Sequence, residues 1–116
     1  MSREKPPLPG AKVRGSKTGR PIMAALDLFG RRWALRILWE LRAKPLTFRD
    51  LQEACGEISP AVLNTRLGEL REAGIVQLET PSGYTLTPDG QALIGALLPL
   101  HDWAERWAIN TNRQRR

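Results

Sequence analysis

The chain has 116 residues, a length that fits one domain with a modest core, and a formal net charge of +6 at pH 7. A single cysteine, Cys55, excludes an intrachain disulfide framework, and no apolar stretch approaches the roughly 20 residues of a membrane span. The first residues are basic but lack the apolar segment of a secretory signal, so we expect a cytoplasmic protein.

Lys and Arg are concentrated at the two ends of the sequence. Residues 1–20 hold six basic residues and one acidic residue, together with three prolines and three glycines. Residues 111–116 hold three arginines, whereas residues 21–110 hold nine basic and eleven acidic residues. We therefore expect a disordered basic arm at 1–20, a folded domain at 21–110 and a basic tail at 111–116. Such tails suit a polyanion such as nucleic acid, although they can also simply solubilise a chain.

Two helices are predicted at the start of the domain. Residues 21–30 form a short apolar helix, with Pro21 in its first turn and Gly30 at its end. Residues 31–44 form a second helix that Pro45 ends. Its apolar residues recur at helical spacing: Trp33, Ala34, Ile37, Leu38 and Leu41.

Two further helices follow, each preceded by a capping residue. Thr47 caps a helix over 47–55, and Ser59, followed by Pro60, caps a helix over 59–73 that Gly74 ends. The second of these helices points three leucines inward: Leu63, Leu67 and Leu70.

A hairpin and a last helix complete the domain. Residues 75–80 and 84–87 alternate as strands do, and "PSG" joins them. Thr87-Pro88 then opens a helix of about twenty residues, apolar around most of its circumference, which Pro99 should kink. The order predicts a mostly α fold with a small β-hairpin wing, a winged helix-turn-helix. Residues 47–55 would be the supporting helix, 59–73 the recognition helix and 76–87 the wing.

Three segments carry a resemblance to a known family: "ALDLFGRRWALRILWEL" (25–41), "LTFRDLQEACGEISPAVLNTRLGELREAGIV" (46–76) and "YTLTPDGQAL" (84–93). They resemble the HxlR-type winged-helix regulators, which are relatives of the MarR regulators. The resemblance implies a homodimer that binds palindromic operator DNA, with the recognition helix in the major groove and the wing near the backbone. It also implies that the first and last helices form the dimer interface.

The sequence departs from this family in two places. Several members have a redox-active cysteine just before the first helix, where this chain has "GRPIM". The wing, "ETPSGY", is shorter and more acidic than usual, so a DNA contact by the wing and a purely structural hairpin both stay open. Cys55 lies near Glu53 and Glu57, which favours an unreactive, structural thiol over a redox site.

The outer face of the recognition helix carries the candidate base contacts. Asn can bond to adenine, Thr can contact a thymine methyl, and Arg can reach guanine or phosphate. The alternative is that these residues have no binding role, since the exposed face of any helix carries polar residues. The candidates on this helix are Ser59, Ala61, Asn64, Thr65 and Arg66.

Backbone contacts are expected from residues around the helix. Helix capping or solvent exposure would explain the presence of several of these polar residues equally well. These candidates are Arg31, Arg32, Thr47, Arg49, Ser82 and Tyr84.

The apolar residues of the first and last helices have two alternative roles. They form either part of the chain's own core or a dimer interface (a seam between two copies), which could include a ligand pocket between the subunits. One small domain cannot cover a helix that is apolar all round, which favours the seam. The candidates are Ile22, Leu26, Leu93, Leu97, Leu100, Trp103 and Trp107.

Catalytic motifs are missing from the sequence. It has no Gly-rich phosphate loop, nucleophile elbow or His-Glu-x-x-His, and one His with one Cys cannot form a four-ligand zinc site. We expect no enzyme activity, metal or cofactor, and a packed or solvated His101.

The sequence therefore predicts a homodimeric regulator, a repressor, that binds double-stranded DNA at a pseudo-palindromic operator, with a small-molecule effector possible. The alternative is a winged-helix protein-interaction module whose tails bind nucleic acid without specificity; RNA is a third, weaker alternative because exposed aromatics are few.

Overall fold

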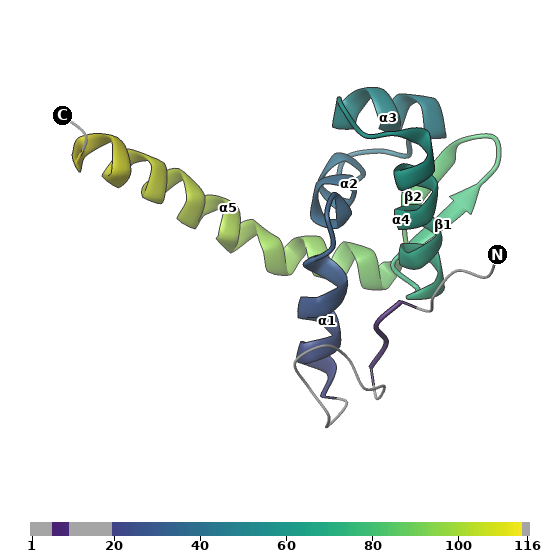
Figure 1. Ribbon diagram of the computed structural model, residues 1–116, viewed down its shortest axis with the longest axis horizontal. Helices are drawn as coiled ribbons and strands as arrows, with labels where there is room; N and C mark the ends of the chain where they lie inside the picture. The colour runs from purple at the N-terminus through teal and green to yellow at the C-terminus, as the bar shows by residue number, and fades with distance from the viewer. Residues whose placement is uncertain (1–5, 10–19, 115–116) are drawn as a thin grey trace.

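A computed structural model describes residues 6–9 and 20–114 of the chain. The described part contains, in chain order, α1 (Pro21–Phe29), α2 (Ala34–Glu40), α3 (Phe48–Cys55), α4 (Pro60–Glu72), β1 (Val76–Glu79), β2 (Gly83–Leu86) and α5 (Pro88–Gln114). The predicted winged helix-turn-helix is confirmed: α3 and α4 form the helix-turn-helix, and the two strands form the wing beside α4 (Figure 1).

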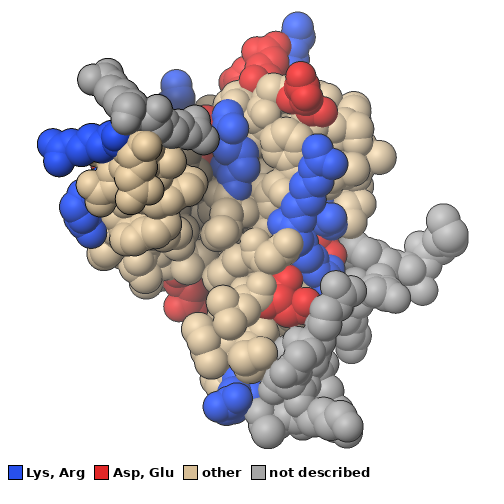
Figure 2. Space-filling view, turned by 60° about the vertical axis from the view of Figure 1, so that its left-hand side comes forward, with Lys and Arg blue, Asp and Glu red and all other residues tan. Residues whose placement is uncertain are grey.

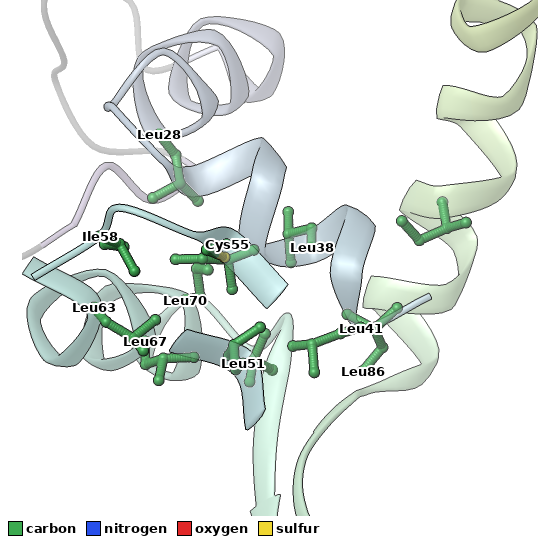
Figure 3. Close-up of a cluster of buried hydrophobic side chains, with 13 residues drawn as sticks. Leu28, Leu38, Leu41, Leu51, Cys55, Ile58, Leu63, Leu67, Leu70 and Leu86 are labelled. Atoms are coloured by element: carbon green, nitrogen blue, oxygen red, sulfur yellow. The ribbon is translucent and has the colours of Figure 1, made fainter. Parts of the chain in front are cut away.

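The core lies where all five helices and the wing meet, and Ile94 is its contribution from α5. Apolar side chains from α1 to α4 and from both strands converge there, and the side chains labelled in Figure 3 point toward one another from these elements. The three inward leucines predicted for the recognition helix are fully covered. Burial of these apolar side chains is the main favourable term that holds α4 in place.

The wing is a short antiparallel hairpin tied to the segment before α3. Val76 pairs with Leu86 and Glu79 with Gly83. The amide of Tyr84 donates to the Leu46 carbonyl over 2.7 Å, and the Leu46 amide donates to the Tyr84 carbonyl over 3.0 Å. The hairpin is therefore fixed against the helix-turn-helix by backbone bonds.

The second helix is shorter than predicted. The sequence pattern favoured a helix over 31–44, but α2 comprises Ala34–Glu40. Arg31, Arg32 and Trp33 instead form a corner between α1 and α2, and Trp33 has a left-handed backbone with φ 76°. The sequence predicts the end of the first helix at Gly30, but apolar periodicity continues through this corner and no Pro or Gly marks the left-handed residue. The extension of the turn through Trp33 was therefore not predicted.

The last helix is longer than predicted. α5 has 27 residues rather than about twenty, continues through Pro99 and includes Thr111–Gln114, which we had assigned to the C-terminal tail. Proline removes one helical hydrogen bond, whereas good helix formers such as Leu, Ala, Glu and Arg recur after it and favour continuation of the helix. The first half of α5 packs on the body, and the second half projects away from it (Figure 1).

Part of the predicted N-terminal arm is described. Pro6 and Pro7 are buried, and Pro7 and Pro9 line a hollow together with residues of α1 and α5. Residues 1–5, 10–19 and 115–116 lie outside the described residues, and with them most of the basic arm and the end of the tail.

Candidate nucleic-acid interface

Two capped helices and a tight turn build the helix-turn-helix. The Thr47 hydroxyl accepts from the Asp50 amide over 3.1 Å, and the Ser59 hydroxyl accepts from the Val62 amide over 3.2 Å. These bonds satisfy amides that the first helical turn leaves without a partner. Between the helices, the Gln52 side-chain amide donates to the Ile58 carbonyl over 3.3 Å, which holds the turn.

The outward side of α4 carries a row of small and polar residues, which we call the α4 stripe: Ala61, Asn64, Thr65, Gly68 and Arg71. Ala61, Asn64 and Arg71 are exposed, and Thr65 and Gly68 are half-buried. They recur at the three- and four-residue spacing of one helix face, opposite the buried leucines. Such a narrow face, with a glycine in its middle, can approach a groove edge closely.

Two of the residues predicted to contact DNA, Arg31 and Arg66, bond to other groups inside the chain. The Arg66 side chain donates from Nε to the Arg32 carbonyl over 2.8 Å and from Nη1 to Glu69 over 3.0 Å. Arg31 donates from Nη1 to the same Glu69 carboxylate. Arg66 therefore lies on the flank of α4 that faces the α1–α2 corner and is not a member of the α4 stripe.

The other backbone candidates surround α4 on several elements. Thr47 and Arg49 lie at the start of α3, and the Arg49 side chain is 87% exposed with Glu53 at 3.6 Å. Arg32 lies at the exposed α1–α2 corner, 5.7 Å from the Trp33 ring centroid. Ser82 is exposed at the wing turn, whereas Tyr84 is half-buried because its strand pairs with Leu46.

An open hollow of about 560 Å³ separates α4 from the wing. Gly68, Arg71 and Glu72 line it from α4, and Val76, Gln77 and Leu78 line it from β1. Sequence reasoning missed Arg71, although its spacing from Asn64 and Gly68 places it on the same helix face. It extends the α4 stripe toward the wing and brings a cation to this end of the helix.

Charge of both signs is spread over the body. On the face shown in Figure 2, Lys and Arg side chains lie next to Asp and Glu side chains, with large uncharged areas between them. Several described arginines have acidic neighbours within 4.0 Å, including Arg31, Arg36 and Arg66. Long-range attraction of nucleic acid by the body is correspondingly weak, and local contacts gain importance.

Large apolar side chains are exposed on α1 and α5. Ile22 and Leu26 are 60% and 59% exposed, and Trp103 and Trp107 are 50% and 57% exposed. The two tryptophan rings are stacked on each other, 5.5 Å between centroids, and both belong to the second half of α5. Leu98, Leu100 and Ile109 add to this surface. An apolar surface of this extent is typical of an interaction site.

The predicted seam residues divide into two groups. Leu93 and Leu97 pack partly against the chain's own core, whereas Leu100 is exposed. A groove of about 310 Å³ between α2 and α5 lies beside them, lined by Leu35, Arg36, Trp39, Leu97, Leu100, His101 and Ala104. His101 stacks on Trp39, 5.6 Å between ring centroids, and lies 3.6 Å from Glu105.

Cys55 is buried at the end of α3, and the residue is 4% exposed. Burial raises the pKa of the Cys55 thiol above its usual value, and Glu40 adds to the rise while Arg36 opposes it. The sequence had pointed to Glu53 and Glu57 for this effect. The described residues contain no group of three His, Cys, Asp or Glu side chains able to hold a metal ion.

Comparison with known proteins gives one family. The model of the HxlR-like helix-turn-helix matches residues 28–112. The chain is 34% identical to the HTH-type transcriptional regulator YodB of Bacillus subtilis over 90 residues, which cover 72% of this chain and 80% of YodB. It is also 34% identical to the B. subtilis regulator YvaP over 89 residues, 72% of this chain and 82% of YvaP.

Solved structures of similar proteins point to the same family as the sequence comparisons. Quinone-bound YodB superimposes with a TM-score of 0.68 at 33% identity, covering 73% of this chain and 94% of that chain. A structure from Enterococcus faecalis V583, described as a MarR-family transcriptional regulator, gives 0.69 at 31% identity, covering 89% and 99%. None of the described helices is long and apolar enough to cross a membrane. The chain belongs to the HxlR family of helix-turn-helix transcriptional regulators.

Proposed function

We propose that the chain binds double-stranded DNA as a homodimer, at a pseudo-palindromic operator, and represses transcription by occupying it. The α4 stripe carries this proposal. It is an exposed to half-buried row of small and hydrogen-bonding groups on a helix that is held in place by its N-terminal cap, its buried leucines and the wing. Asn64 and Thr65 would contact base edges, and Ser59, Thr47 and Arg49 would contact phosphates at the two helix starts.

The dimer part of the proposal depends on α1 and α5. Their exposed apolar side chains form a surface that a second copy would cover, and two-fold symmetry would then present two α4 stripes to one duplex. Recognition helices of such dimers enter the major groove about one helical turn apart, ~34 Å, or a multiple of it. Arg31 and Arg66 are left out of the proposed contacts because Glu69 holds both of them.

The alternative, a protein-interaction module with unspecific nucleic-acid binding, draws support from the mixed charge of the body. A small-molecule effector also stays a prediction for this chain. The YodB structure bound to quinone shows a ligand only for that relative.

The experiment compares two single variants on a duplex that the full chain selects from a random pool. Asn64→Ala should lose preference at one or two bases, at about 1–3 kcal/mol per base, while other positions keep theirs. Arg49→Ala should weaken all sequences alike. Asn112→Ala, at the exposed end of α5, is the matched control and should change neither quantity. Identical profiles for Asn64→Ala and wild type would contradict base contact by the α4 stripe.

A further inference from the structure

Glu69 is a buried charge inside the recognition helix. Its residue is 3% exposed, and within residues 6–9 and 20–114 it is the only charged residue that is buried. Burying a carboxylate is costly unless charged partners bond to it. An apolar residue at this position would fill the flank of α4 that faces the α1–α2 corner at lower cost, so the carboxylate calls for an explanation.

The partners of Glu69 come from two different parts of the fold. Arg66 belongs to α4 itself, one turn earlier, and bonds to Glu69 over 3.0 Å. Arg31 belongs to the α1–α2 corner, 38 residues away in sequence, and bonds to the other carboxylate oxygen. Arg31 also lies 4.0 Å from Asp27 of α1. A line of alternating charges thus runs from α1 to α4.

The corner depends on α4 in return. Arg66 donates to the carbonyl of Arg32, and the next residue, Trp33, has a left-handed backbone at φ 76°. A bulky residue is strained in this conformation and keeps it only where its surroundings fix it. The Arg66 bond is one such restraint. Helix α4 and the α1–α2 corner therefore hold each other in one arrangement.

We infer that Glu69 is a positioning residue that fixes the orientation of α4 relative to α1. A buried carboxylate tolerates few geometries, because both of its oxygens must keep their arginines, whereas leucine packing alone tolerates small rotations of a helix. Since α1 belongs to the proposed dimer surface, Glu69 would set the separation of the two α4 stripes. This last consequence rests on the proposed function, but the positioning itself does not.

The first test measures the α1–α4 distance within one chain. Spin labels are placed at Arg20→Cys and Asn64→Cys in full-length protein with Cys55→Ala, diluted with unlabelled chain so that only intrachain distances count. Glu69→Gln should broaden the distance distribution. Glu40→Gln is the matched control, since Glu40 pairs with Arg36 inside one helix at 3.1 Å, and it should leave the distribution as in wild type.

A second variant covers the case in which Glu69→Gln does not fold. Arg31→Gln removes the bond between Glu69 and the corner but leaves the Arg66–Glu69 pair and the Arg66 bond to the Arg32 carbonyl, and it should broaden the same distribution. A folded Glu69→Gln or Arg31→Gln protein with the wild-type distribution would overturn the inference, whatever the change in Tm.

The second test uses DNA. Wild-type chain is titrated with its selected inverted repeat and with the same repeat lengthened or shortened by one base pair. Mutations in a coupled network change the coupling between two sites by about 2- to 30-fold. Glu69→Gln should therefore reduce the ratio of affinities for the selected and the altered half-site spacing by such a factor. The affinity for a single half-site should stay as in wild type. An unchanged preference would contradict the dimer consequence. If wild type selects no repeat, the proposed function fails, and the distance measurement still decides the role of Glu69.

Discussion

Tyr84 and Leu46 exchange two backbone hydrogen bonds, of 2.7 Å and 3.0 Å, and so join the wing to the residue before the Thr47 cap of α3. The pairing brings Gly83 against the Leu46 backbone, where a Cβ atom at position 83 would overlap it. The wing is therefore part of the frame that supports the helix-turn-helix, in addition to any contact it makes with DNA.

Gly83→Ala should destabilise the fold. Gly83 has φ 105°, a conformation that costs other residues about 1–3 kcal/mol, and the steric overlap adds to this loss. Gly95→Ala is the control, because Gly95 lies in α5 with nothing near its Cβ position, and alanine there should stabilise by about 0.5–1 kcal/mol. Urea unfolding measures both. Equal stability of the two variants would show that the Leu46 pairing does not restrain the wing.

Arg71→Ala should weaken DNA binding for all sequences and reduce the slope of log Kd against log salt by about 1, as expected for one lost phosphate contact. The basis is the position of Arg71 at the hollow between α4 and the wing. Arg106→Ala, an exposed arginine on α5, should leave the slope unchanged. A lower slope for Arg106→Ala with an unchanged slope for Arg71→Ala would mean that α5, rather than the α4 stripe, contacts the DNA phosphates.

Replacing Trp103 and Trp107 together by Glu should convert a dimer into a monomer. Both rings are half-exposed on the projecting part of α5, and charges there oppose burial against a second copy. Sedimentation equilibrium should give twice the chain mass of 13.0 kDa for wild type and one mass for the variant. Gln91→Glu on the first turn of α5 controls for added charge. A monomeric wild type would refute the dimer surface.

Stability should fall as the pH rises through about 9, in part because of Cys55. Its pKa is raised in the folded chain, mainly by burial, so the folded state keeps the thiol proton at a pH where the unfolded chain loses it. The contribution is complete below the unfolded pKa and is lost as the pH rises through the higher folded pKa. Urea unfolding of wild type and Cys55→Ala across this range checks the sign: the difference between them should shrink as pH rises. A constant difference would mean that the thiol titrates normally.

Local rules in the sequence were enough for most of the fold. Hydroxyl caps at Thr47 and Ser59, the leucine spacing in α4 and the turn residues of the wing each act over a few neighbours, and the structure confirms them. The predicted length of α5 was too short because the basic end at 111–116 was assigned to a tail, whereas the helix continues to Gln114.

The contacts between distant residues could not be predicted. Nothing near Glu69 in the sequence shows that Arg31 reaches it. The sequence proposes Arg66 as a DNA contact because it lies on the recognition helix and Arg31 because it lies at a helix start, and neither position reveals the bonds to Glu69. The left-handed Trp33 is stabilised by the same long-range contacts and was missed for the same reason. Arg71 could have been found, because its spacing from Asn64 and Gly68 is a helical one.

Selection of the full chain on a random pool of double-stranded DNA tests the central claim most directly. The account predicts an enriched inverted repeat whose half-sites lie about one helical turn apart, ~34 Å, or a multiple of that distance. A folded chain that enriches no sequence, and binds all duplexes with equal affinity, would contradict it.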